Sequence, residues 1–399
     1  MSRSIVVVGA GLAGLSAVRA LRALGHPGRI VLVGKEPHAP YDRPPLSKEF
    51  LGGALTVEGL SLAAPGDDAL DVEVRTADPA TALDPGARRV RLASGEWVGG
   101  EGVVLACGAR ARQLPAAAGV HTLRTLDDAL ALRDVLRPGA RLVVVGGGFI
   151  GAEVASTARG LGLDVTVVEA APVPMAAALG ERFGGVCARW HRDHGVRLVT
   201  GVGVAGIVGA APGPGRRGGV ARAVRLDDGR ELPADVVLVA VGSTPDVDWL
   251  AGSGLDVDRG VRTDADGATG VPGIVATGDC TCRVEPAAGT VVRQEHWTNA
   301  LHHPHRAVAA LLGRPAPAPP VAAAVPYFWS DQYGVRLQFA GHRRPGDEEH
   351  VVEGDPDDGA FVAEYRRDGE LVALVAADSP RLFTRRRREL AAALAGRAR

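Results

Sequence analysis

The chain of 399 residues is long enough for two or three domains. Apolar residues make up 46% and charged residues 23%, as in soluble globular proteins, and a net charge of −1 gives no overall attraction to nucleic acid or an anionic membrane. Because no apolar run reaches the ~20 residues that span a bilayer and the N-terminus lacks a signal-peptide pattern, we expect a cytoplasmic protein that binds neither nucleic acid nor membrane.

The chain opens with a predicted strand, turn, helix and second strand. The run "SIVVVG" is typical of a buried parallel strand, and "LAGLSAVRALRALG" has helical periodicity that stops at a glycine. Between them Gly9, Gly11 and Gly14 have the spacing G-x-G-x-x-G, and Glu36 follows the second strand. Such a turn lets a pyrophosphate approach the backbone at the N-terminus of a helix.

A second unit in the middle of the chain repeats each of these parts. The segment "ARLVVVGGGFIGAEVASTARGLG" contains Gly146, Gly148 and Gly151 in the same spacing, and Glu169 ends the strand that follows. One such glycine pattern is weak evidence. Two patterns, each with both strands, the helix and the terminal acid, predict binding sites for two dinucleotides.

The remaining segments predict connections and a last small domain. The segments 102–110 and 235–246 are both apolar strands that run into a glycine, and we interpret each as a crossing of the chain between domains. The Gly/Pro-rich stretch 209–219 predicts a mobile hairpin loop, and the Pro/Ala-rich stretch 314–324 predicts a linker. Beyond the linker, "AFVAEYRRDGELVALVAAD" predicts a hairpin of two strands about a glycine turn.

Cysteine and histidine residues give no metal or dithiol pattern. His302, His303 and His305 adjoin Pro304 without a partner cluster, so we predict no metal, and the proline predicts a disturbed helix or a turn. No C-x-x-C occurs, and we interpret the cysteines as reduced structural thiols. They are Cys107, Cys187, Cys280 and Cys282.

The chain resembles the FAD-dependent, NADH-using ferredoxin reductases of bacterial oxygenase systems, of the putidaredoxin reductase type. The resemblance covers nearly the whole chain and rests on "GAGLAG", "PYDRPPLSKEFL", "ACGAR", "LRTLDDA", "GGGFIGAE", "VATGDC", "EHWTNA" and "PYFWSDQYG". It implies an α/β fold with two Rossmann-like dinucleotide-binding domains, for FAD and NAD, and a small α+β C-terminal domain. The implied domains are a discontinuous FAD domain of residues 1–110 and 245–320, an NAD domain of 111–244 and an interface domain of 321–399.

The resemblance also implies roles for individual residues. Lys48 and Glu153 would form a catalytic ion pair beside the flavin, although a solvated loop lysine and an acid in the first turn of a helix remain structural alternatives. Residues implied for FAD are Gly9, Gly11, Ala13, Gly14, Glu36, Arg43, Lys48, Arg124, Asp279 and Trp297. Residues implied for NADH (NAD+) are Gly146, Gly148, Ile150, Gly151, Glu153, Glu169 and Gly242. Asp279 could equally be a helix N-cap, and Trp297 a core residue.

The implied partner is an iron–sulfur ferredoxin, of the 2Fe-2S type or similar, which would feed an oxygenase. Trp329, Arg306 and Arg386 are candidates for its docking surface, on a protein that is a monomer or weak dimer. Lys35 and Val173 depart from the family pattern near the two adenosines and leave the strength of NADH binding open. Two alternatives stay open: a thiol- or peroxide-type pyridine nucleotide oxidoreductase, and a redox-responsive binding flavoprotein of the apoptosis-inducing-factor type.

Overall fold

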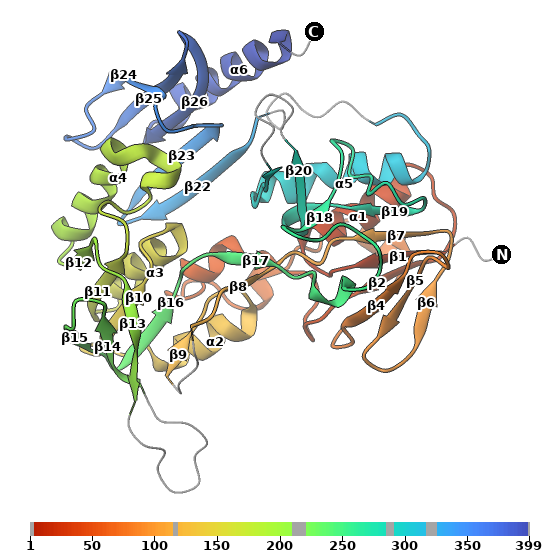
Figure 1. The fold of residues 1–399 in the computed structure, drawn as a ribbon, viewed down its shortest axis with the longest axis horizontal. Helices are drawn as coiled ribbons and strands as arrows, with labels where there is room; N and C mark the ends of the chain where they lie inside the picture. Colours follow the sequence, from red (N-terminus) through yellow and green to blue (C-terminus); the bar gives the residue numbers. More distant parts are fainter. Residues whose placement is uncertain (1–3, 115–118, 210–220, 285–290, 317–324, 398–399) are drawn as a thin grey trace, which may run out of the picture. The chain divides into compact units, whose positions relative to one another are not determined.

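The computed structural model describes residues 4–114, 119–209, 221–284, 291–316 and 325–397. The predicted loop at 209–219 and linker at 314–324 lie for the most part outside these ranges. The chain forms two compact units (Figure 1). The first unit consists of residues 1–42, 61–110 and 244–327, and the second of residues 43–60, 111–243 and 328–399. Residues 43–60 thus group with the second unit, whereas the sequence placed them in the first domain.

The first unit is built on a five-stranded parallel sheet. In spatial order its strands are β19 (Ile274–Ala276), β7 (Gly102–Leu105), β1 (Ile5–Val8), β2 (Ile30–Val33) and β3 (Val72–Arg75). Its central strands are apolar throughout because both faces of the sheet are covered.

Alternation along β1 sends its side chains to two different layers. Ile5 and Val7 pack among residues of α1 (Leu12–Ala23) and α5 (Trp297–Leu311). Val6 and Val8 pack on the opposite face, against a three-stranded antiparallel sheet. That sheet consists of β4 (Ala80–Asp84), β5 (Arg89–Leu92) and β6 (Trp97–Gly99).

Smaller elements complete the first unit. The first unit also contains a sheet of β18 (Val261–Arg262), β20 (Thr281–Val284) and β21 (Val291–Val292) and three short 3-10 turns among the described residues. These turns are η3 (Asp67–Leu70), η4 (Asp248–Leu250) and η5 (Gly278–Cys280). The pair β8 (Ala109–Ala111) and β17 (Ser243–Pro245) forms where the chain passes from one unit to the other.

Helix α5 corrects one expectation, because it continues through Pro304 without a break. The ring removes one backbone donor from the helix. The turns around it are nevertheless held by tertiary packing, since Pro304, Ala307 and Val308 are buried and the last two pack in the core with α1. Packing of this face therefore overrides the local preference of the proline.

The second unit contains the other parallel sheet. In spatial order its strands are β12 (Arg197–Thr200), β11 (Asp164–Glu169), β10 (Arg141–Val145), β16 (Val236–Val239) and β9 (Val120–His121). Its helices are α2 (Leu126–Val135), α3 (Phe149–Gly160) and α4 (Ala176–Asp193), with 3-10 turns η1 (Pro44–Ser47) and η2 (Glu58–Leu60). An antiparallel sheet of β13 (Val204–Gly209), β14 (Ala221–Leu226) and β15 (Glu231–Pro233) packs on it.

The C-terminal part of the second unit is an antiparallel sheet followed by a helix (Figure 1). In spatial order its strands are β22 (Tyr327–Gln332), β23 (Val335–Gly341), β26 (Glu370–Ala377), β25 (Phe361–Arg367) and β24 (Glu348–Gly354), and the helix is α6 (Pro380–Arg397). The predicted hairpin is confirmed as β25 and β26, joined through Asp368 and Gly369 at positive φ. One face of the sheet packs against α4, with Phe361 stacked on Phe183 at 5.3 Å between ring centroids.

Candidate functional site

The first glycine turn lies between β1 and α1. Gly9 has a φ of +117°, which glycine alone adopts readily, and a Cβ there would collide with the carbonyl oxygen of Ala106. A Cβ on Gly14 would collide with the carbonyl oxygen of Gly9, so the third glycine lets the helix approach the turn. Around Gly11, by contrast, space is open: no other atom of the residues that the structure describes lies within 4 Å of the position that a Cβ would take.

The start of α1 is suited to an anion. Gly11 is its N-cap, and among the described residues no side chain caps it and no acid lies in its first turn. Its first N–H groups and the positive end of its dipole therefore stay available to a ligand. A pyrophosphate fits the open space at Gly11, so this turn can hold a dinucleotide.

The second glycine turn, between β10 and α3, has the same construction. Gly146 has a φ of +107°, and a Cβ on it would collide with the carbonyl oxygen of Ala240. A Cβ on Gly151 would collide with the carbonyl oxygen of Gly146, while Gly148, the N-cap of α3, again faces open space. The two cradles thus match glycine by glycine.

Each cradle has a carboxylate at the end of its second strand. The Tyr41 hydroxyl donates to Glu36 Oε2 at 2.6 Å. The backbone N–H groups of Gly147 and Ala171 donate to the two oxygens of Glu169, each at 2.8 Å. The Glu169 side chain is therefore fixed against the glycine turn itself. The neighbour of Glu36, Lys35, forms an ion pair with Asp246 at 3.0 Å.

Three further residues predicted for FAD lie in the first unit. Ala13 on α1 is close to η5, since a Cβ on Gly278 would come within 2.9 Å of the Ala13 Cβ. Asp279 is the next residue of η5. Trp297 begins α5, and its Nε1 donates to Asp42 Oδ1 at 2.9 Å, so it makes a specific polar contact as well as packing.

Arg43, Lys48 and Arg124, also predicted for FAD, belong to the second unit. The Arg43 guanidinium donates to the carbonyl oxygen of Arg124 at 2.5 Å. Arg124 directly precedes a capping box, in which Thr125 and Asp128 exchange hydrogen bonds at the start of α2. The structure thus brings the two arginines together at a rigid helix start.

The predicted pair of Lys48 and Glu153 is formed. Lys48 Nζ lies 2.8 Å from Glu153 Oε2 and also donates to the carbonyl oxygen of Pro44 at 2.8 Å. The Ser47 hydroxyl donates to the same carboxylate oxygen at 2.5 Å. Glu153 is only 5% exposed. Lys48 is therefore not a solvated loop lysine, because it neutralises a buried carboxylate.

Sequence reasoning missed two residues of this cluster, Ser330 and Gln332. The Ser330 hydroxyl donates to Glu153 Oε1 at 2.7 Å, and Gln332 Nε2 donates to the Ser330 hydroxyl oxygen at 3.0 Å. Both lie on β22, in the segment "WSDQ". The segment is part of the family resemblance, which implies a role only for its tryptophan.

The other two residues predicted for NADH lie in the second unit at exposed positions. Ile150, in the first turn of α3, is 41% exposed, which is unusual for a large apolar side chain. Gly242 has a φ of +94° and open space where a Cβ would lie. The exposed Ile150 side chain and the open space at Gly242 are compatible with contact to a flat ligand.

The residues predicted for docking already have partners within the chain. The Arg306 guanidinium is paired with Asp266. Arg386 lies 2.9 Å from Glu389 and 3.6 Å from Glu364. Trp329 is half-buried on β22. On α6, Arg381, Arg385 and Arg388 are exposed, whereas Arg386 is partly buried and paired, so Arg386 stabilises the helix more directly than it presents charge.

Two cysteines far apart in the sequence meet in the first unit. A hydrogen bond to Cys280 and burial raise the pKa of Cys107 well above its ordinary value, and the same bond lowers the pKa of Cys280. The Cys280 thiol also donates to the carbonyl oxygen of Thr277 at 3.2 Å. No short cysteine spacing encodes this contact, so it could not be predicted from the sequence.

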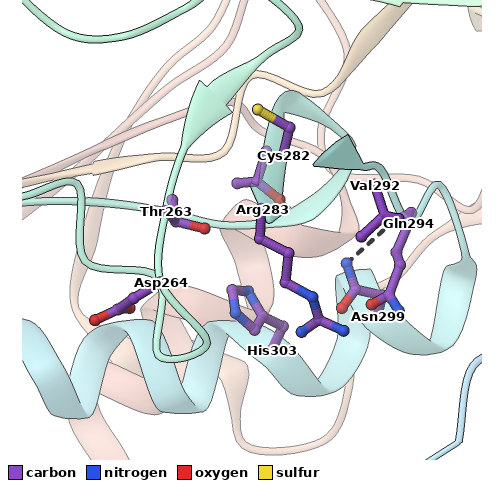
Figure 2. A pocket seen from close by; sticks show the side chains of 9 residues that line it. Thr263, Asp264, Cys282, Arg283, Val292, Gln294, Asn299 and His303 are labelled. Carbon is purple, nitrogen blue, oxygen red and sulfur yellow. Dashed lines mark hydrogen bonds between the residues drawn. The ribbon is translucent and has the colours of Figure 1, made fainter. Parts of the chain in front are cut away.

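A small polar pocket lies between α5 and the sheet of β18, β20 and β21 (Figure 2). Its volume of about 20 Å³ suits a single water. His303 lines it and is hydrogen-bonded to the Thr277 hydroxyl at 3.0 Å, and burial lowers the pKa of His303 to about 4. The lining residues are Thr263, Asp264, Thr281, Cys282, Arg283, Val292, Gln294, Asn299 and His303.

Two absences apply to the described part of the chain. No group of three or more His, Cys, Asp or Glu side chains is arranged to hold a metal ion. No helix there combines the length and the apolar character needed to cross a membrane.

Two family models match the chain in succession. The model of pyridine nucleotide-disulphide oxidoreductases matches residues 3–303, which include both cradles. The chain belongs to this family. A model of a reductase C-terminal domain matches residues 327–398, the sheet that contributes Ser330. The predicted α/β fold with parallel sheets and a C-terminal domain is thereby confirmed.

Individual members of the family resemble the chain over nearly its whole length. The ferredoxin–NAD(+) reductase component of the biphenyl dioxygenase system from Paraburkholderia xenovorans (strain LB400) is 38% identical, over 96% of this chain and 92% of its own. Rhodocoxin reductase from Rhodococcus erythropolis is 39% identical over 90% of this chain and 82% of its own. The covalent putidaredoxin reductase–putidaredoxin complex contains a chain with a TM-score of 0.89 and 32% identity, over 97% of this chain and 93% of that one.

Proposed function

We propose that the protein is an NADH-dependent reductase that passes electrons through FAD to a small iron–sulfur ferredoxin. The observation that carries this proposal is the presence of two open glycine cradles of the same construction, one in each unit. Two cradles can bind two dinucleotides, one that stays bound and one that binds and dissociates in each turnover. FAD supplies the chemistry, since a flavin accepts hydride and releases electrons singly.

The cradle in the first unit would hold FAD, and the cradle in the second unit would receive NADH. In the second cradle, two backbone N–H groups hold the Glu169 carboxylate at the strand end. A carboxylate there accepts hydrogen bonds from ribose hydroxyls and repels the 2′-phosphate of NADPH. We therefore propose NADH as the preferred donor.

Lys48 and Glu153 would act at the reacting end of the cofactors. Lys48 would hold a positive charge where electron density grows on reduction, and preorganised charges of this kind stabilise such transfers. Glu153 would fix the direction of the Lys48 ammonium through the 2.8 Å contact. The buried position of the pair keeps this interaction strong, because water screens it little.

The electron acceptor would be a 2Fe-2S or similar ferredoxin that serves an oxygenase. The relatives named above include the reductase component of a dioxygenase system and the reductase of a covalent complex with putidaredoxin. Trp329 and Arg306 remain our candidates for the docking surface. We further propose that the protein works in the cytoplasm as a monomer or weak dimer.

A direct test starts from the purified protein. Acid precipitation should release one FAD per chain. In a separate native sample, NADH should bleach the visible absorbance of the flavin, and a ferredoxin from the same gene neighbourhood should be reduced catalytically. Failure of NADH to bleach the flavin would reject the proposed function.

The two alternatives predict different results. A thiol- or peroxide-type enzyme would need Cys107 and Cys280, so the double substitution to serine should abolish its turnover, whereas we expect electron transfer to persist. A binding flavoprotein would remain reduced for a long time after NADH addition. Rapid oxidation by ferredoxin, followed by stopped-flow absorbance, would distinguish the reductase from that protein.

A further inference from the structure

Strand β22 presents two chemically different faces. Ser330 and Gln332 are fully buried, whereas Trp329 and Asp331 between and beside them are partly exposed. The buried pair belongs to a line of polar groups that ends at the Glu153 carboxylate. A buried run of polar side chains is unfavourable unless its members bond to each other.

The hydrogen bonds of this line have a single direction. Gln332 Nε2 donates to the Ser330 oxygen at 3.0 Å, so the serine uses its proton for Glu153 Oε1, at 2.7 Å. The other carboxylate oxygen, Oε2, is occupied by Lys48 and Ser47. Each oxygen of Glu153 therefore has its own donors, and the plane of the carboxylate is fixed from two sides.

We propose that Ser330 is a positioning residue, which aligns Glu153 with Lys48 for the transfer of hydride from NADH, and that Gln332 orients the serine. The inference rests on the proposed function. Without Ser330, Oε1 would be a buried acceptor with no donor from β22, and the carboxylate could rotate away from the lysine. The C-terminal domain would then contribute to the first half-reaction as well as to ferredoxin docking.

The test follows flavin reduction by NADH in a stopped-flow instrument. Ser330→Ala should lower the limiting rate by about ten-fold, the effect of one lost hydrogen bond to a charged group, with the apparent dissociation constant of NADH nearly unchanged. Ser330→Thr, which keeps the hydroxyl, should restore most of the rate. Gln332→Met should slow the reaction less, because the serine can still donate.

Ser156→Ala is the matched control. The Ser156 hydroxyl accepts a hydrogen bond from the Tyr333 backbone at 2.7 Å, so it also joins α3 to the end of β22 but does not contact Glu153. Its rate should equal that of the wild type. A Ser156→Ala rate that falls as far as that of Ser330→Ala would overturn the inference, because general packing of β22 would then explain both.

A second readout does not depend on activity. In a Glu153→Ala background, Ser330→Ala should lower the thermal unfolding midpoint by less than it does in the wild type, because its partner is gone. Equal shifts in both backgrounds would overturn the inference. If the wild-type flavin is not bleached by NADH, the proposed function fails; if it is bleached and Ser330→Ala matches the wild type, only the present inference fails.

Discussion

The Glu153 carboxylate is almost completely buried, yet both of its oxygens accept hydrogen bonds. Three different side chains donate to it, and one of them, Lys48, has the opposite charge. A buried charge without such partners would cost several kcal/mol. Ser47 ends the 3-10 turn that Lys48 caps, and both side chains donate to the same oxygen, Oε2.

The first prediction concerns Lys48. Lys48→Met should slow flavin reduction by NADH at least about ten-fold and lower the free energy of unfolding by about 3 kcal/mol, because Glu153 loses its counter-charge. Lys35→Met is the control, since that lysine is 65% exposed and its pair with Asp246 should contribute below about 1 kcal/mol. Stopped-flow rates and urea unfolding measure the two effects. Equal behaviour of the two variants would contradict the assigned role of Lys48.

The second prediction concerns Glu169. Glu169→Ala removes the charge that would repel the 2′-phosphate of NADPH. The ratio of kcat/KM for NADH over NADPH should fall by at least about ten-fold, which corresponds to ~1.4 kcal/mol. Steady-state kinetics with ferricyanide measure this ratio. A wild-type enzyme that uses both donors equally well would show that Glu169 does not select.

At the scale of elements, the strand–turn–helix cradles were the most predictable parts of the molecule. Their signal is local: apolar strand, spaced glycines and helical periodicity all lie within one stretch. The hydrogen bonds between Ser330 and Glu153 and between Cys107 and Cys280 join segments that are far apart in the sequence. A local pattern of residues does not encode such contacts. The helix continues through Pro304, against the local preference of proline, because tertiary packing holds the turns on either side.

The third prediction separates two roles of glycine within one cradle. Gly14→Ala should impair folding, because the new methyl group would meet the carbonyl oxygen of Gly9. Gly11→Ala should leave the far-UV circular dichroism of the apoprotein unchanged, since that position faces open space. It should nevertheless weaken FAD binding by at least about ten-fold, because the methyl group would occupy the place of a phosphate. Full FAD occupancy of Gly11→Ala would contradict the cradle assignment.

At the scale of the whole molecule, each unit contains a buried histidine that resists protonation. Burial lowers the pKa of His191 to about 4 in the second unit and that of His303 to about 4 in the first. An unfolded chain would protonate both near pH 6.5. Acid therefore favours the unfolded form of both units over the same pH range.

The fourth prediction is a loss of stability between pH 6.5 and pH 4. In this window the unfolded chain binds more protons than the folded one, so stability decreases as pH falls. His191 alone should account for up to about 3 kcal/mol. His191→Gln should flatten the dependence, as measured by thermal unfolding in a pH series. An unchanged slope would show that His191 does not control it.

The fifth prediction concerns salt and docking. Ferredoxin reduction should slow as ionic strength rises and the Debye length falls to ~8 Å, whereas ferricyanide reduction should barely change. Arg306→Glu should have the effect of high salt. Arg386→Glu is a poorer probe, because its partner Glu364 is almost fully buried and would face a second negative charge, whereas Asp266, the partner of Arg306, is 43% exposed. Exposed Arg385 on the same helix should be reversed instead. If neither ionic strength nor the charge-reversal variants change the rate of ferredoxin reduction, electrostatic docking is rejected.

The scarcity of lysine has a practical consequence for conjugation chemistry. Only Lys35 and Lys48 occur in the whole sequence. The Lys48 side chain is 12% exposed and its ammonium is engaged, while Lys35 is 65% exposed. Amine-directed reagents should therefore modify the folded protein almost exclusively at Lys35 and the terminal amine. A fluorophore or a surface tether could thus be attached at a nearly unique point, without mutagenesis and without touching the buried lysine.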